Sequence, residues 1–323
     1  MKGYLISDLP VKVDLEAYQH AVDRVVESLG NVLGCSSVYR IGSVGAPGIS
    51  DLDLVVVAKD NASLSIDLRK TMTISERYLF IHDLYGSSAS LFLEGQRFSF
   101  FRPYRLIRGE DILFGSNFPE PDPAVRRQVA LEYLIRFYFS VTMQKAYKLL
   151  RVRSLLLNAK GASIDIEYLS PSDIQVRGVV RKLKSMREDW FKTQKPPVAA
   201  FIEWFEEMAH WLEHFMTDQL SRLPFYLPDH RSYSLGRNIG IIHGDSVKMM
   251  SKVSRYPMLH PFLGKKYFNL LNRYSNFQLS LPFIAKDIPE PVRAYFNYNQ
   301  RHRDYNKLHL PHYLPLTSSF NPR

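Results

Sequence analysis

Apolar residues near the start of the chain follow two different patterns. Residues 14–33 show helical spacing, with Asp14 as the expected N-cap and apolar positions at Leu15, Tyr18, Val22, Val25, Val26, Leu29 and Val32. Two dense β-branched runs follow, at residues 38–41 and 54–57. Runs of this kind predict buried strands. The chain therefore begins with a predicted helix and two predicted strands.

The pattern continues with three further elements before a proline-rich segment. We predict a second helix at residues 61–72, a third strand at 78–84, and a hairpin at 90–101 with Glu94-Gly95 at its tip. The order helix–strand–strand–helix–strand–strand is typical of a compact α/β domain with a mixed sheet and flanking helices. We assign this domain to residues 1–115.

The rest of the chain divides by periodicity. The proline-rich composition of the segment 117–123 predicts a linker. Its Asp122-Pro123 pair is typical of the start of a helix, and a long helix is expected to follow. This helix is expected to continue past residue 150 and end before Gly161. Two more helices are predicted from Ser170-Pro171 to Trp190 and from Pro196-Pro197 to Leu220. Residues 116–225 therefore predict a helical bundle, and residues 226–323, where periodicity weakens, a mixed helical and irregular region that could bind an acceptor.

Composition narrows the functional classes. The chain of 323 residues has 46% hydrophobic residues and a net charge of +10, so we expect an anionic partner, with nucleic acid as the first candidate. A single cysteine, Cys35, excludes an internal disulfide and suits a reducing compartment. The N-terminus lacks the apolar core of a signal peptide, and no apolar window is long enough for a membrane span. We expect a cytoplasmic protein with no membrane partner.

The most informative stretch joins the two predicted strands. Gly42-Ser43 ends the first strand, a glycine-rich turn follows, and Asp51-Leu52-Asp53 opens the second. Residues i and i+2 of a strand face the same side, so the two carboxylates lie together and repel each other unless a cation is present. Hard divalent ions such as Mg²⁺ favour carboxylate oxygens together with substrate phosphates. A glycine beside a serine also lets backbone N–H groups approach phosphate oxygens. The stretch predicts a metal–phosphate site.

This arrangement resembles the signature of the DNA polymerase beta superfamily of nucleotidyltransferases: a hydrophobic residue, Gly-Ser, a loop, and then Asp-hydrophobic-acid-hydrophobic. The resemblance covers about the first 110 residues. It implies a nucleotidyltransferase fold in which Gly42 and Ser43 line the triphosphate site. It also implies that Asp51 and Asp53 ligate catalytic Mg²⁺ (or Mn²⁺), with Asp83 as the third acid on a later strand.

The function implied by the resemblance is transfer of a nucleoside monophosphate from a nucleoside triphosphate, such as ATP, to an acceptor, with release of pyrophosphate. The basic charge balance favours RNA, tRNA included, as the acceptor over a cationic small molecule. A protein hydroxyl also remains open as the acceptor.

The third acid stays open at this point. Asp83 matches best, Glu94 is another candidate, and a different strand pairing would put the position on Ser99. In that last case the domain has only two acids. The alternative function is then a catalytically inactive module of the same fold that binds nucleic acid or a protein partner.

Three other patterns allow two interpretations each. His210-Trp-Leu-Glu213-His214 has the spacing of an inverted zinc-peptidase motif, although two histidines on an amphipathic helix are commoner. A basic run is either a solvated helix face or a face for a nucleic acid backbone; it comprises Arg177, Arg181, Lys182, Lys184 and Arg187. The tail at 295–313 interleaves basic and aromatic residues, which suits base stacking and packing equally.

Overall fold

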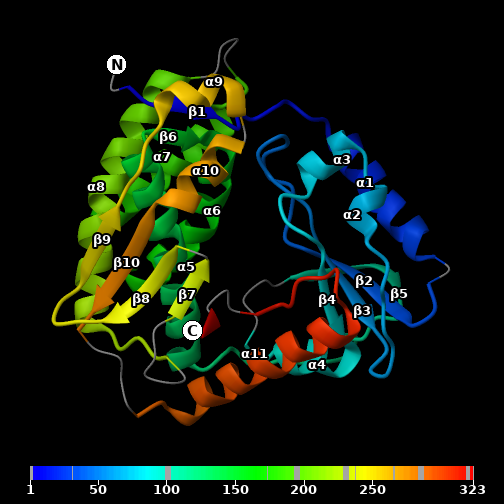
Figure 1. The fold of residues 1–323 in the computed structure, drawn as a ribbon. Coiled ribbons are helices and arrows are strands. Elements are labelled where there is room, and N and C mark those ends of the chain that lie inside the picture. The colour runs from blue at the N-terminus through cyan, green and yellow to red at the C-terminus, as the bar shows by residue number, and fades with distance from the viewer. Residues whose placement is uncertain are drawn as a thin grey trace. The chain divides into compact units, whose positions relative to one another are not determined.

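The computed structural model describes residues 3–30, 32–98, 103–172, 174–192, 197–227, 233–236, 238–264, 266–282, 287–317 and 321–322 (Figure 1). The chain forms two compact units whose segments interleave along the sequence. We call Val11–Arg126 together with Pro289–Ser318 the four-stranded unit. Met1–Pro10, Arg127–Ile288 and Ser319–Arg323 make up the five-stranded unit. Both contain helices and strands, so the protein is mixed α/β.

The four-stranded unit is built on a mixed sheet with strand order β4-β3-β2-β5. Its strands are β2 (Cys35–Ile41), β3 (Asp53–Ala58), β4 (Tyr85–Ser88) and β5 (Tyr104–Gly109). β2 pairs antiparallel with β3 and with β5, whereas β3 pairs parallel with β4. β3 is an inner strand, and its residues from Leu54 to Ala58 are fully buried on both faces.

Helices cover both faces of this sheet. α1 (Leu15–Leu29) packs Tyr18, Val22 and Val25 into one core with Leu54 and Val56. On the other face, Val55 and Val57 pack with Phe92 of α4 (Ala89–Gly95). The alternation of β3 side chains between these two cores is the reason for its unbroken β-branched run. Two short helices, α2 (Leu68–Thr71) and α3 (Ile74–Leu79), lie between β3 and β4 in the chain.

The C-terminal helix α11 (Glu290–His309) belongs to this unit because it packs against β4. Gly86 of β4 is the centre of the contact: its carbonyl oxygen is 3.0 Å from His302 Nε2 and accepts from Asn306 Nδ2 at 2.9 Å. The Gly86 N–H in turn donates to Leu314 O. A Cβ at this position would lie 2.6 Å from the Cβ of Tyr313, so only glycine permits the close approach.

The five-stranded unit combines long helices with a second mixed sheet. Its long helices are α5 (Pro123–Tyr147), α6 (Val152–Leu169), α7 (Ile174–Asp189) and α8 (Val198–Arg222). The sheet has strand order β11-β7-β8-β10-β9. Its strands are β7 (Tyr233–Gly236), β8 (Ile239–His243), β9 (Lys248–Lys252), β10 (Asn276–Leu281) and β11 (Asn321–Pro322). The rings of Tyr147 at the end of α5 and Phe277 on β10 meet edge to face, with centroids 5.6 Å apart and planes at 80°.

Smaller elements complete this unit. β1 (Leu5–Ser7) pairs parallel with β6 (Leu149–Arg151). Between β9 and β10 the chain forms η1 (Pro257–Leu259), α9 (His260–Leu263) and α10 (Lys266–Tyr274). Within the described part of the chain, no helix combines the length and the apolar character needed to cross a membrane.

The expectations for α1, β2 and β3 and for the starts of the long helices are confirmed to within a few residues. The expected continuous helix beyond residue 150 is wrong, because α5 ends at Tyr147. Lys148 there adopts a φ of 53°, and the next three residues pair with β1. The strands in residues 233–281 were not predicted, since that region lacks a strong alternating pattern.

Three expectations between β3 and β5 are also wrong. The helix at 61–72 is only the four-residue α2. The strand at 78–84 is the end of α3 followed by irregular chain; Thr73 begins α3 with a reciprocal capping box to Glu76. Residues 90–95 of the hairpin expected at 90–101 belong to α4 instead, because Ser88 Oγ accepts the N–H of Leu91 as an N-cap. Residues 99–101 of that prediction lie outside the described structure. Short apolar runs do not distinguish strand from buried helix, and the caps decide between them.

Candidate metal centre

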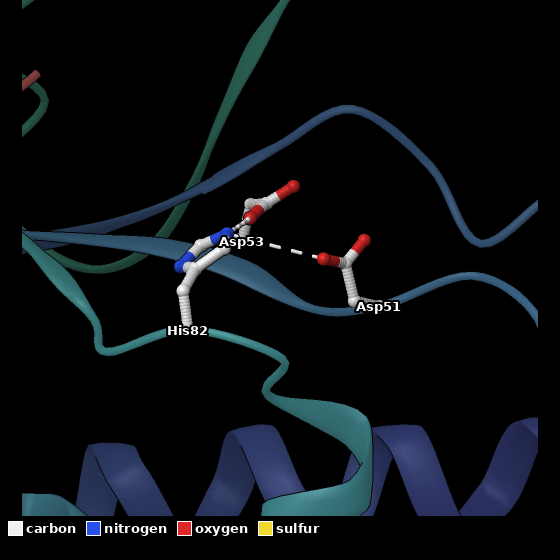
Figure 2. Close-up of side chains that lie close together, drawn as sticks. All are labelled: Asp51, Asp53 and His82. Atoms are coloured by element: carbon white, nitrogen blue, oxygen red, sulfur yellow. Dashed lines mark ion pairs between the residues drawn. The ribbon is translucent and has the colours of Figure 1, made fainter. Parts of the chain in front are cut away.

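Asp51, Asp53 and His82 form a cluster of side chains that could hold a metal ion (Figure 2). One ligand atom from each residue lies within 4.8 Å of the other two. His82 Nε2 is 2.7 Å from Asp53 Oδ1 and 3.9 Å from Asp51 Oδ2. All three side chains are partly buried, and Asp51, at 11% exposure, is the most covered. Such a site is reachable from solvent but shielded enough to strengthen electrostatic interactions.

Strand pairing places the glycine–serine pair beside the carboxylates. Ile41, the last residue of β2, is registered with Asp53, the first residue of β3. Gly42 and Ser43 therefore leave the sheet next to Asp53, and both are exposed. Gly42 has a φ of 64°, a conformation that favours glycine, and no atom lies within 4 Å of the position that a Cβ would occupy there. The predicted proximity of the two halves of the motif follows from this register.

The loop between Ser43 and Asp51 is fixed by two tyrosines. Tyr18 Oη accepts the N–H of Gly48 at 2.9 Å and donates to the carbonyl of Ser50 at 2.8 Å. Tyr78 Oη donates to the carbonyl of Gly48 at 2.6 Å. A loop held from two helices positions Asp51 without needing a ligand to order it. Pre-organised ligands of this kind favour metal binding because little ordering remains to be done.

His82 has the second hydrogen bond that metal-binding histidines usually make. Its Nδ1 lies 2.8 Å from the carbonyl oxygen of Asp83, so Nδ1 carries a proton and donates it. This leaves Nε2 facing Asp53 and Asp51, either as a metal ligand or as the second N–H of an imidazolium. Partial burial lowers the pKa of His82, but the hydrogen bond and charge of Asp53 outweigh it, so its pKa is raised overall. The raised pKa favours the imidazolium form, whose second N–H would face Asp53 and Asp51.

The predicted third acids lie elsewhere in the described structure. Asp83 is exposed, and its Oδ1 pairs with Arg69 Nη1 at 2.8 Å. It lines a pocket of about 320 Å³ together with Arg69, Lys70, Arg77 and residues of the C-terminal segment. Glu94 on α4 pairs with Arg301 of α11. Ser99 lies outside the described residues. The structure thus gathers Asp51 and Asp53 but brings His82, not Asp83, to them.

His82 was missed because the sequence was searched for a third acid. The only local indication of its role was its position directly before Asp83, in the segment predicted to be a strand. A strand would have put His82 and Asp83 on opposite faces, and nothing local says which face meets the carboxylates. The segment 80–84 is irregular instead, and Figure 2 shows His82 pointing from it toward Asp53.

The histidine motif, the basic run and the basic and aromatic tail form contacts within their own surroundings. The rings of His210 and His214 on α8 meet edge to face with centroids 4.6 Å apart, and both residues are exposed. The described residues hold no third ligand for them, since Asp51, Asp53 and His82 are the one such group found there. Two cations of α7 are paired: Lys182 with Glu207 and Lys184 with Glu167. The tail at 295–313 is largely α11, and its Tyr298 and His302 are buried against β4 and α4.

The donor set at the cluster is two carboxylates and one imidazole. Carboxylate oxygens suit Mg²⁺ and Mn²⁺, whereas an imidazole nitrogen adds affinity for transition metals. The residues fit a divalent cation, and Mn²⁺ satisfies all three donors more readily than Mg²⁺. No family model matches the chain, and no curated protein matches it.

Proposed function

We propose that the protein is a metal-dependent nucleotidyltransferase that moves a nucleoside monophosphate from a nucleoside triphosphate to an acceptor and releases pyrophosphate. The observation that carries the proposal is the placement of Gly42-Ser43 beside the cluster of Asp51, Asp53 and His82 by the register of β2 with β3. The resemblance of this stretch to the DNA polymerase beta superfamily signature supports the same reaction.

Each residue has a role under this proposal. Asp51 and Asp53 would hold the divalent cation, Mg²⁺ or Mn²⁺, and His82 would complete its protein ligands. When bound, the cation neutralises charge that develops on the transferring phosphoryl group. Gly42 and Ser43 would receive the triphosphate, since both are exposed at the end of β2 and Gly42 carries no side chain that hinders approach. Asp83 would have to break its ion pair with Arg69 before it could act as a third acid, so it is a weaker candidate than Asp51 and Asp53.

The acceptor we favour is RNA. The net charge of +10 supports a polyanionic partner, and a cationic acceptor would need an acidic cleft. The pocket that Asp83 lines is not an acidic cleft, because its lining residues include three cations and only two acids.

The direct test is to incubate the protein with Mg²⁺ or Mn²⁺, each labelled nucleoside triphosphate in turn, and bulk RNA. Transfer of label with release of pyrophosphate supports the proposal. The double variant Asp51→Asn with Asp53→Asn should abolish transfer, whereas Asp23→Asn, an exposed carboxylate on α1, should retain it. Full transfer by the double variant would reject the site.

A second candidate function is a non-catalytic module of the same kind. The observation that favours it is the ion pair of His82 with Asp53, because an imidazolium can satisfy the two carboxylates without a metal. Nucleotide bound without transfer or pyrophosphate release, under every metal tried, would select this second function.

A further inference from the structure

A long segment of the five-stranded unit contains no acidic residue. Between Asp245 and Asp287 the sequence has no Asp or Glu, whereas the whole chain has 32. The same segment carries seven cations: Lys248, Lys252, Arg255, Lys265, Lys266, Arg273 and Lys286. It builds β9, η1, α9, α10 and β10, with β9 at the outer edge of its sheet (Figure 1). An acid-free stretch of this length concentrates positive charge on one part of the unit.

Packing gathers three of these cations and two tyrosines on one part of the surface. Lys252, the last residue of β9, pairs with Asn276, the first residue of β10. β10 begins two residues after the end of α10, so this pairing places the end of β9 near the end of α10. Ser254 Oγ donates to the carbonyl of Tyr274, so the segment after β9 is fastened to the end of α10. The rings of Tyr256 and Tyr274 then meet edge to face with centroids 6.3 Å apart.

We call the resulting group the basic tyrosine patch, which comprises Lys252, Arg255, Tyr256, Arg273 and Tyr274. Every member is exposed, and the two tyrosine residues are 41% and 52% exposed. Arg273 lies over the ring of Tyr274, with its Cζ 5.8 Å from the ring centre. In the part of the chain that the structure describes, none of the three cations pairs with a carboxylate.

The scaffold beneath the patch is already packed. α10 is amphipathic, but its apolar side is used inside the unit, where Tyr267 and Leu271 are 1% and 0% exposed. Tyr267 Oη also accepts the N–H of Tyr256 at 3.2 Å, which ties the patch to that core. α10 has no free apolar face of the kind that an amphipathic helix needs to bind a bilayer, but the neighbouring η1 and α9 expose Met258 and Phe262 at 79% and 86%. A lipid surface is therefore the competing occupant that the test must separate. We favour a polyanion because the patch itself consists of three cations and two aromatic rings.

We infer that the basic tyrosine patch binds single-stranded RNA. Exposed tyrosine rings stack on bases of any sequence, and unpaired cations contact the phosphates between them. The inference rests on the proposed function in one respect: it treats the bound RNA as the acceptor of the nucleoside monophosphate. Binding itself needs neither the metal nor the nucleotide, so each proposal can fail alone.

The test measures fluorescence anisotropy of a labelled 12-nucleotide single-stranded RNA of mixed sequence, in the presence of EDTA, with the full-length protein. The variant Arg255→Ala/Arg273→Ala should weaken binding about tenfold and lower the slope of log affinity against log salt by about 1.4. Tyr256→Ala/Tyr274→Ala should weaken binding at least about fivefold with little change in that slope. The matched control Arg177→Ala/Arg181→Ala, which removes two exposed arginines from α7, should change affinity less than about twofold.

Tryptophan fluorescence melting of each variant checks its folding, because Trp190, Trp204 and Trp211 all lie in this unit. The inference is overturned if the wild-type protein binds no RNA, or if the patch variants bind as tightly as the wild type. It is also overturned if the α7 control loses as much affinity as the patch variants, since binding would then follow total charge. Loss of binding to phosphatidylglycerol vesicles by the patch variants, with RNA affinity intact, would assign the patch to a membrane instead.

Discussion

The two units of the chain handle charge in opposite ways. The four-stranded unit places two carboxylates side by side at the start of β3 and partly covers them. The five-stranded unit has a long segment without any acid and exposes three of the cations of that segment together with two tyrosines. Concentrated negative charge suits a divalent cation, and concentrated positive charge suits a polyanion. The contrast teaches that the proposed chemistry and the proposed RNA binding have separate physical bases, so each can be removed without the other.

The largest expected effect separates Asp53 from Asp83. Asp53→Ala should lower transfer at least about 1000-fold, because it removes a carboxylate from the cluster. Asp83→Ala should lower it less than about tenfold, since that carboxylate is exposed and paired with Arg69. Steady-state rates of pyrophosphate release measure both. Equal losses would show that Asp83 joins the metal site during the reaction, and RNA binding should be unchanged in either variant.

A second prediction uses acid to separate the stabilities of the two units. His302 is fully covered, and burial lowers its pKa to about 4, with the hydrogen bond to Gly86 opposing the shift. The unfolded chain takes up this proton near pH 6.5 and the folded unit does not. The stabilising contribution is therefore full above pH 6.5 and is lost as pH falls toward 4, by up to about 3 kcal/mol.

Hydrogen exchange of α11 and β4 between pH 7 and pH 4 reports this loss, because both elements contact His302. The three tryptophans report the five-stranded unit alone, and their transition should move less. His302→Gln should flatten the pH dependence of the four-stranded unit. An unchanged dependence in that variant would mean that other groups control acid unfolding.

A third and smaller effect concerns the identity of the third ligand. His82→Ala should weaken Mn²⁺ binding at least about tenfold, because Nε2 is lost from the donor set. Isothermal titration calorimetry measures the affinity, and His210→Ala, an exposed histidine on α8, serves as the matched control. Mn²⁺ affinity equal to that of the wild type would mean that His82 acts only as a counter-ion to Asp53.

The smallest expected effect tests whether a cation of the five-stranded unit outside the basic tyrosine patch contributes to RNA binding. Lys182 on α7 pairs with Glu207 on α8, and both side chains are more than half exposed. Lys182→Ala should change stability by less than about 0.5 kcal/mol and RNA affinity by less than twofold. Chemical denaturation followed by tryptophan fluorescence measures the first quantity. A loss of RNA affinity comparable to that of the patch variants would count against the basic tyrosine patch, since binding would then follow total charge.

Local pattern was enough wherever one period dominated. The β-branched run of β3 and the apolar stripe of α1 were both predictable, because each element satisfies its own period without help from distant residues. Between β3 and β5 the runs are short. Ser88 caps α4 where a hairpin was expected, and Thr73 caps α3, which ends at Leu79 and leaves the rest of the expected strand at 78–84 irregular. The sheet in residues 233–281 also escaped prediction, since its pairing joins strands separated by a long connection.

The sequence by itself determined that Asp51 and Asp53 lie together beside Gly42-Ser43, because a short turn joins the two halves of the motif and Ile41 is registered with Asp53. The expected strand alternation is not the reason, since β3 begins only at Asp53 and the loop before Asp51 is held by tyrosines of α1 and α3. Only the tertiary structure decided which residue meets them. The capping box begins α3 at a fixed point, the irregular chain after it turns His82 inward, and Asp83 pairs with Arg69 instead. The basic tyrosine patch also depends on tertiary packing, since Tyr256 and Tyr274 come together only when the segment after β9 is fastened to α10.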